Sequence, residues 1–251
     1  MKPPKVTKTK PAFVSHSPET GADYTIYVDG PGPSASGAPS SGVLVMDGDF
    51  FFDGAVKAAR SLSKAGRIPA PFIIGVGYGA GFGQPGNFRG RDYTPTASPE
   101  EPSSGGADRF LGYLEKTLWP ELARRYPLRE KGRAIAGHSL GSLLVLYALF
   151  QGRPFFDLAL ASAPSIWWDN RSILAEVSKV RDARASLDSR LYLGVGENDS
   201  PSMASDMALL EKLLKKRPFK DLRVVSEVFP GHDHYDVLPL TLSAGLASLL
   251  G

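Results

Sequence analysis

The chain of 251 residues carries 29 lysine and arginine residues against 26 aspartate and glutamate residues, so its formal net charge is only +3. This near balance does not favour a nucleic-acid partner, and 42% hydrophobic residues are enough to build the core of one large domain. The chain contains no cysteine, which excludes disulfides, thiolate metal sites and a cysteine nucleophile.

The N-terminal segment, residues 1–20, is expected to form a flexible arm because it is rich in lysine, proline and threonine. No apolar run follows its lysines, so neither a signal peptide nor a transmembrane helix is visible. We therefore expect no membrane partner and a cytoplasmic location, or a periplasmic one if a leader was removed. The sequence predicts no particular oligomeric state.

Residues 21–251 are expected to form a single domain. Tyr24, Ile26 and Val28 alternate with polar residues and predict a first strand, whereas the Pro-, Gly- and Ser-rich stretch 31–42 predicts a loop. Apolar runs then alternate with helical patterns. Strands are predicted at 43–46, 72–76, 133–136, 158–161, 191–195 and 224–229, and helices at 53–65, 107–126 with an interruption at Pro120, 142–150 and 235–250. This alternation predicts a doubly wound α/β fold with a mostly parallel sheet.

The pentapeptide at 137–141, Gly-His-Ser-Leu-Gly, has the GxSxG pattern of a nucleophile elbow. In a chain this rich in glycine and serine, chance gives roughly 0.3 such matches, so the pattern alone is weak. Its position is more informative, because it lies between the predicted strand 133–136 and the predicted helix 142–150. A sharp turn there lifts the Ser139 hydroxyl above the sheet, and the two glycines avoid collisions with the strand and the helix. We therefore predict Ser139 as the nucleophile.

A serine hydroxyl needs a base, and the chain has four histidines. His16 lies in the arm, and the side chain of His138 diverges from that of its neighbour Ser139, so neither is a good base. His232 and His234 lie in the loop before the last helix, where a base is expected. We favour His234, with His232 as the alternative. A metal site at this pair is disfavoured, because no further ligand cluster accompanies it.

The acid is expected after the preceding strand, which runs into Glu197 and Asp199. Either carboxylate gives the order serine, acid, histidine. The spacing favours Asp199, Glu197 is the alternative, and either could instead cap the following helix.

Two backbone N–H groups are needed to stabilise the oxyanion. Leu140, which follows the nucleophile, supplies one. The second is expected from the turn 46–50 with Asp49 as the donor, and Gly48 lets the backbone approach the substrate.

Several longer motifs extend this pattern: MDGD from Met46, RDYTPT from Arg91, GGADRF from Gly105, AGHSLG from Ala136, APSIWW from Ala163 and FPGHDHYDVLP from Phe229. Together they resemble the esterase family of α/β hydrolases that includes ferric-enterobactin and salmochelin esterases, and more distantly S-formylglutathione hydrolase and the mycolyltransferases. The resemblance covers most of residues 20–250 and implies the α/β-hydrolase fold, with Ser139 and His234 as the catalytic pair. The acid varies among siderophore-cleaving relatives, so a serine–histidine dyad stays open.

Ligands of open α/β sheets bind beyond the carboxyl ends of the strands, where the segments 77–96 and 162–170 are predicted to lie. Two tryptophans there could form an aromatic wall or pack on the core, and two arginines could bind an anionic or catecholate substrate or pair with Asp92 or Asp108. The residues expected on the substrate side are Gly48, Arg89, Arg91, His138, Trp167, Trp168 and His232.

The expected activity is hydrolysis of a carboxylic ester through an acyl-enzyme intermediate, without metal or cofactor. Ser139 attacks, His234 transfers the proton, and Asp199 or Glu197 orients the histidine. The expected substrate is a small molecule, either a siderophore-type lactone, as the resemblance suggests, or a small acyl ester. The alternatives are acyl transfer to an alcohol on the same scaffold and a non-catalytic binding protein with a hydrolase fold.

Overall fold

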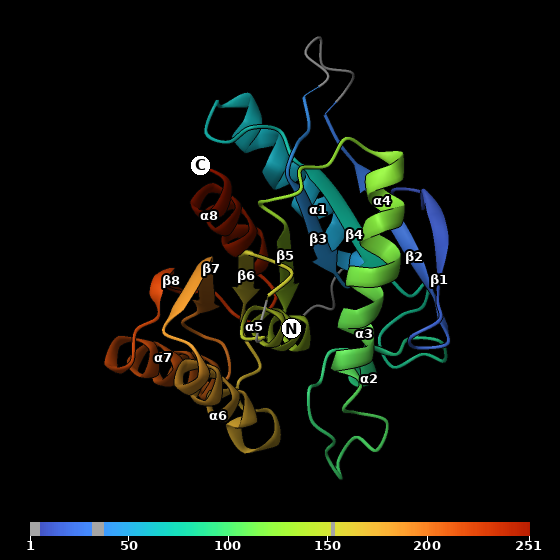
Figure 1. Cartoon of the computed structure of the whole chain (residues 1–251). Coiled ribbons are helices and arrows are strands. Elements are labelled where there is room, and N and C mark those ends of the chain that lie inside the picture. The colour runs from blue at the N-terminus through green and yellow to red at the C-terminus, as the bar shows by residue number, and fades with distance from the viewer. Residues whose placement is uncertain (1–5, 32–37, 152–153) are drawn as a thin grey trace.

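The computed structural model describes residues 6–31, 38–151 and 154–251, which form one eight-stranded sheet covered by helices (Figure 1). Residues 1–5 of the expected arm and 32–37 of the expected loop lie outside the described residues. The strands are β1 (Phe13–Ser17), β2 (Ala22–Asp29), β3 (Gly42–Met46), β4 (Phe72–Gly77), β5 (Ala134–His138), β6 (Leu158–Ser162), β7 (Ser186–Gly196) and β8 (Lys220–Phe229). The helices are α1 (Gly48–Lys64), α2 (Arg89–Asp92), α3 (Ala107–Tyr113), the π-helical turn η1 (Leu114–Leu118), α4 (Trp119–Arg125), α5 (Leu140–Leu149), α6 (Trp168–Ala183), α7 (Pro201–Lys216) and α8 (Leu238–Leu250). Within the described ranges, none of these helices is long and apolar enough to cross a membrane.

The strand order in the sheet is β1-β2-β4-β3-β5-β6-β7-β8. Every neighbouring pair from β4 to β8 is parallel, and β1 and β2 run antiparallel at one edge. β3 to β6 are buried along their whole length, which explains why their sequences are continuous apolar runs rather than alternating ones. The predicted doubly wound α/β fold is confirmed.

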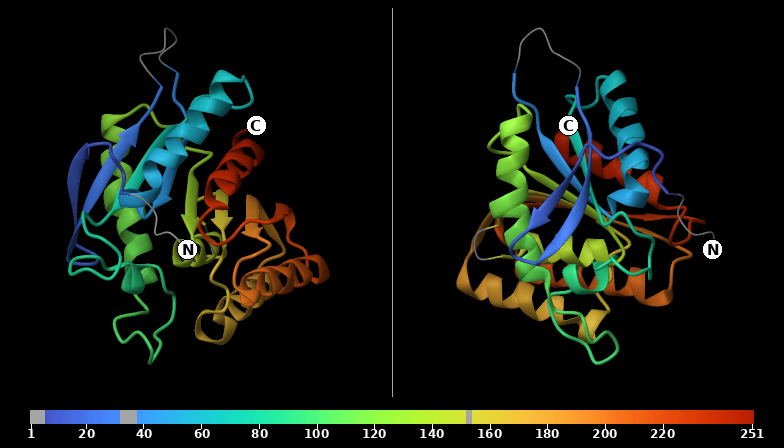
Figure 2. Two further views of the ribbon diagram at one scale, coloured as in Figure 1. Left: turned by 180° about the vertical axis from the view of Figure 1, so that it is seen from behind. Right: turned by 90° about the vertical axis from the view of Figure 1, so that its right-hand side faces the viewer.

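Helices cover both faces of the sheet, as the two views of Figure 2 show. Phe52 of α1 and Leu246 of α8 pack in one apolar cluster with Leu160 of β6. The neighbouring residue Ala161 points to the opposite face, where it joins a larger cluster with Leu144 of α5. Because successive side chains of a strand point to opposite faces, a single buried strand supplies both cores.

The helix predicted at 107–126 is a continuous helical segment made of α3, η1 and α4. Pro120 lies in the first turn of α4, directly after η1. A proline has no N–H to donate and its ring needs space near the carbonyl one turn earlier, and the wider π-helical turn supplies that space.

Part of the segment expected to form a flexible arm takes part in the fold. Residues 13–17 form β1 and pair with β2, and Thr7 is hydrogen-bonded to the first turn of α1. The buried positions of β1 are Ser15 and Ser17, whereas Val14 points outward. This inverted pattern hides the strand from a search for apolar alternation.

The chain connections diverge between β3 and β5, because β4 lies on one side of β3 and β5 on the other. Ligands of open α/β sheets bind at the carboxyl ends of the strands that flank such a point. The turns after β3 and β5 lie there, and α1 begins at Gly48 rather than at Asp53 as predicted. A Cβ at Gly48 would lie 2.7 Å from the Gly75 carbonyl carbon and 2.8 Å from the Val76 nitrogen, so the start of α1 packs directly on the backbone of β4.

We predict that Gly48→Ala lowers the free energy of unfolding by about 1–3 kcal/mol, because backbone atoms of β4 must shift to admit the methyl group. Gly54→Ala in the same helix is the matched control, since its Cβ would meet only Leu242 Cδ1 at 3.8 Å. That change should stabilise the protein by about 0.5–1 kcal/mol through helix propensity. Urea unfolding of both variants tests this, and equal stability of Gly48→Ala and wild type would contradict the packing.

Candidate active site

Ser139 lies in a sharp turn between β5 and α5, with φ 58° and ψ −124°. A non-glycine residue is strained in this backbone region, and such strain is concentrated at functional sites. The turn is possible only because its flanks are small: a Cβ at Gly137 would collide with the carbonyl oxygen of Gly141, and a Cβ at Gly141 would lie 3.3 Å from Met46 Cβ. The predicted strand, turn and helix around Ser139 are therefore present.

A positive φ also occurs directly after two neighbouring strands. Asp47 directly follows β3 with φ 53°, and Ala163 directly follows β6 with φ 46°. Together with Ser139 after β5, three adjacent strands each end in a left-handed, non-glycine residue. These turns place the candidate site at the carboxyl ends of the three strands.

The loops after β7 and β8 bring His234 and Asp199 together. His234 Nδ1 lies 2.8 Å from Asp199 Oδ2, and the two side chains are 14% and 3% exposed. The Ser200 N–H donates to Asp199 Oδ1 at 2.6 Å, which fixes the carboxylate. The Asn198 N–H donates to the His232 carbonyl at 2.9 Å, which joins the two loops. With Nδ1 facing the carboxylate, His234 has Nε2 available for a proton.

The alternative acid and base have other partners. Glu197 accepts a hydrogen bond from the Gly231 N–H at 2.9 Å and contacts neither histidine through a hydrogen bond within the described chain. His232 Nδ1 lies 3.1 Å from Asp236 Oδ1, and both side chains are exposed. The geometry therefore pairs His234 with Asp199. It does not pair His234 with Glu197, or His232 with Asp199.

The Ser139 hydroxyl has a neighbour that the sequence did not single out. Ser139 Oγ lies 3.5 Å from Ser165 Oγ, and Ser165 is fully buried in the loop after β6. Over the described ranges, Ser139 Oγ has no hydrogen bond to His234. Catalytic hydrogen bonds are often long or absent in free enzymes and form only with substrate. Ser165 lies within the APSIWW motif, but a serine in a loop carries no signal that would identify it as a site residue.

Two helices begin at the candidate site, α1 at Gly48 and α5 at Leu140. The first N–H groups of a helix have no partner within the helix, and the helix dipole makes this end positive. In the part of the chain that the structure describes, the N–H groups of Asp49 and Leu140 have no hydrogen-bond acceptor. They are therefore free to bind a developing negative charge.

His138 lies beneath the site and is buried. Its Nδ1 lies 3.0 Å from Ser162 Oγ, and its ring centroid is 4.5 Å from that of His234. Burial lowers the pKa of His138 well below its usual range, and the nearby charges of His234 and Arg89 lower it further. Burial therefore favours the neutral form of His138, and its ring packs against the ring of His234.

The two arginines predicted on the substrate side are engaged by carboxylates. Arg89 makes a bidentate ion pair with the buried Asp47, with both N–O distances at 3.0 Å, and Arg91 Nε lies 2.7 Å from Asp92 Oδ1. Their side chains are 19% and 20% exposed. Asp92 is one of the two carboxylates that the sequence suggested as partners of the arginines. The sequence did not suggest Asp47 as the partner of Arg89.

The two tryptophans differ in their surroundings. Trp168 is buried, and its Nε1 donates to Thr96 Oγ1 at 3.2 Å. Trp167 is 40% exposed and its ring lies 6.0 Å from that of Trp168. Of the two, only Trp167 offers aromatic surface to a ligand.

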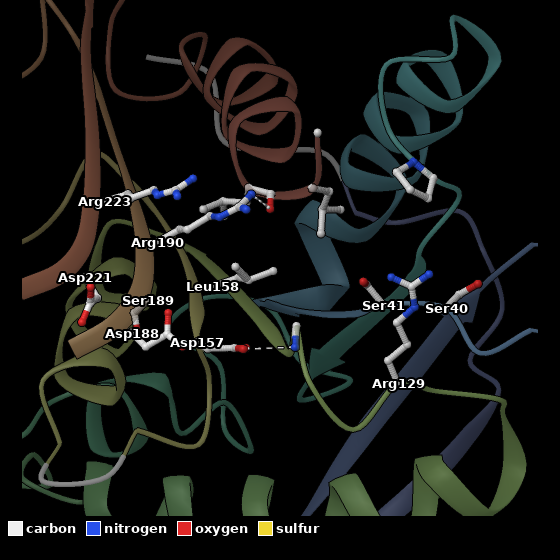
Figure 3. Close-up of a pocket in the computed structure, with 15 residues that line it drawn as sticks. Ser40, Ser41, Arg129, Asp157, Leu158, Asp188, Ser189, Arg190, Asp221 and Arg223 are labelled. Carbon is white, nitrogen blue, oxygen red and sulfur yellow. Dashed lines mark hydrogen bonds between the residues drawn. The ribbon is translucent and has the colours of Figure 1, made fainter. Parts of the chain in front are cut away.

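A cavity of about 680 Å³ lies at the opposite end of the sheet, near Asp157, Arg190 and Arg223 (Figure 3). Asp157 directly precedes β6, and Ser139 directly follows the carboxyl end of the adjacent β5. This cavity is therefore separate from the candidate site. The structure brings no three potential metal ligands together among the residues it describes.

Comparison with known proteins identifies the family. Residues 17–237 match the model of the esterase family described as "Putative esterase". The chain is 31% identical to the ferri-bacillibactin esterase BesA of Bacillus subtilis, over 89% of this chain and 83% of that protein. It is 29% identical to the siderophore triacetylfusarinine C esterase of Aspergillus fumigatus, over 91% and 89% of the two chains.

A solved structure gives the same result. The crystal structure of the BES protein from Bacillus cereus superimposes with a TM-score of 0.84 at 26% identity, covering 100% of this chain and 98% of that one. The strained turn after β5, the fold and these similarities agree with one another. The chain belongs to the esterase family of α/β hydrolases.

Proposed function

We propose that Ser139, His234 and Asp199 carry out ester hydrolysis in this carboxylic ester hydrolase. The observation that carries the proposal is the 2.8 Å contact between His234 Nδ1 and Asp199 Oδ2, on the same sheet edge as the strained Ser139. A carboxylate at Nδ1 fixes the tautomer that leaves Nε2 as the base. It also stabilises the imidazolium that forms when the base takes the proton.

In the first half-reaction, Ser139 Oγ forms a bond with the ester carbonyl carbon, and its proton moves to His234 Nε2. The hydroxyl must exchange its contact with Ser165 Oγ for one with His234 at this stage. The tetrahedral intermediate then collapses, the bond to the alcohol oxygen breaks, and the imidazolium returns the proton to that oxygen. Water repeats the sequence in the second half-reaction and releases the acid and free Ser139.

The negative charge of each tetrahedral intermediate is proposed to lie between the N–H groups of Leu140 and Asp49. Both groups lack an acceptor across the described residues, and each belongs to the first turn of a helix. Donors that are already fixed in place cost no reorganisation when charge develops. Gly48 assists by letting the backbone come close to the substrate.

We propose a siderophore-type ester as the substrate class, and a small acyl ester as the alternative. The proposal is supported by the relatives named for esters of bacillibactin and triacetylfusarinine C. Trp167 is proposed to contact the acyl or aryl part of the substrate because its ring is 40% exposed. Arg89 and Arg91 are proposed to act on the substrate side by holding the loop 77–96 through their aspartates. A panel of esters that includes a siderophore trilactone, iron-free and ferric, compared by kcat/KM, distinguishes the two classes.

We predict that Ser139→Ala lowers kcat for a short-chain p-nitrophenyl ester by about 10⁴-fold or more, because no acyl-enzyme can form. Ser165→Ala is the matched control, since it removes the hydroxyl next to Ser139 but leaves the nucleophile, and it should retain kcat within about tenfold. A Ser139→Ala variant with the wild-type rate would disprove the assignment.

The acid is tested by two conservative amide variants. Asp199→Asn should lower kcat by about 10³- to 10⁴-fold, because an amide favours the wrong tautomer of His234. Glu197→Gln should change kcat by less than about threefold, since Glu197 only accepts a backbone N–H. A larger loss in Glu197→Gln than in Asp199→Asn would reverse the assignment, and no loss in either would indicate a serine–histidine dyad.

A further inference from the structure

The segment of residues 7–9, which we call the N-terminal strap, is hydrogen-bonded to the N-terminal part of α1. Thr7 Oγ1 donates to the Gly48 carbonyl at 2.9 Å, and the Thr7 N–H donates to the Asp49 carbonyl at 2.6 Å. The backbone N–H of Lys8 and the hydroxyl of Thr9 donate to the carboxylate of Asp53, each at 2.7 Å. The strap therefore contacts the residues that the proposed function uses as part of the oxyanion hole.

We propose that Thr7 is a positioning residue for the oxyanion hole, an inference that rests on the proposed function. The Gly48 carbonyl and the Asp49 N–H belong to one peptide unit, which is planar and trans. In such a unit the two groups point in opposite directions. A hydrogen bond that holds the Gly48 oxygen therefore also restricts the direction of the Asp49 N–H at the site.

The same hydrogen bond strengthens the donor. A donor at the carbonyl oxygen draws electron density from the peptide nitrogen, and chains of hydrogen bonds polarise one another in this way. The Asp49 N–H becomes a better donor to an oxyanion. Thr7 thus acts on charge stabilisation without touching the substrate.

Asp49 is held from the other side through its carboxylate. This carboxylate accepts hydrogen bonds from the Tyr27 hydroxyl at 2.7 Å, the Tyr78 N–H at 2.5 Å and the Gly79 N–H at 3.1 Å. These contacts fix the side chain, whereas the two hydrogen bonds of Thr7 hold the carbonyl groups of Gly48 and Asp49 in the first turn of α1.

Loss of one complete oxyanion-hole donor lowers kcat by about 10²- to 10³-fold. Thr7→Val removes the hydroxyl but keeps the branched shape and the backbone N–H bond to Asp49, so it should cause part of that loss. We predict that kcat falls by about 5- to 30-fold with KM within about twofold, because the interaction matters only when the oxyanion forms. The affinity for a trifluoromethyl ketone, which forms the tetrahedral anion, should fall by the same factor.

Two variants are the controls. Thr7→Ser keeps the donor and should retain kcat within about twofold. Thr9→Val removes a hydrogen bond between the strap and Asp53, but Thr9 makes no hydrogen bond to Gly48 or Asp49 within the described residues. Thr9→Val should also retain kcat, with thermal unfolding confirming that all variants are folded. Equal losses of kcat in Thr7→Val and Thr9→Val would overturn the proposal, and so would a rise in KM with unchanged kcat in Thr7→Val. Either result would show that the strap only stabilises the fold.

A failure of the proposed function would give a different result from a failure of the Thr7 proposal. If the wild-type protein hydrolyses the ester no faster than Ser139→Ala, the catalytic assignment is wrong, whatever the strap variants do. If Ser139 is required and Thr7→Val equals wild type in kcat and in ketone affinity, only the role of Thr7 is wrong.

Discussion

The candidate site depends on the close approach of the turns that follow β3 and β5. A Cβ at Gly141 would lie 3.3 Å from Met46, and a Cβ at Gly48 would lie 2.7 Å from the backbone of Gly75. Only small residues allow two helices to begin side by side at this edge of the sheet. The helix starts supply free N–H groups, and the strained turn between them presents Ser139. One packing constraint thus produces both the nucleophile and the site for negative charge.

Charge neutrality is the second feature of the site. The buried Asp47 is neutralised by Arg89, and burial keeps His138 uncharged by lowering its pKa. His234 is left as the group that changes its charge during the proposed reaction, and Asp199 faces it at 2.8 Å. In the proposed reaction this carboxylate is the group that faces the imidazolium of His234.

The sequence predicted what local patterns encode. Continuous apolar runs identified the buried strands, and the GxSxG turn between strand and helix located Ser139. The sequence did not predict β1, because the buried positions of this strand are Ser15 and Ser17. The predicted start of α1 at Asp53 is too late, because the apolar residues Phe51 and Phe52 fit a strand as well as a helix. The choice of Asp199 over Glu197 and the pairing of Arg89 with Asp47 depend on contacts between distant loops, which spacing along the chain does not determine.

Covalent labelling with a fluorophosphonate, followed by digestion and mass spectrometry, tests whether Ser139 is an activated nucleophile. An activated serine reacts with this probe, whereas an ordinary hydroxyl does not. We expect one label, on the peptide that contains Ser139, and no label in Ser139→Ala. A label on Ser165, or wild-type protein that remains unlabelled, would contradict this expectation.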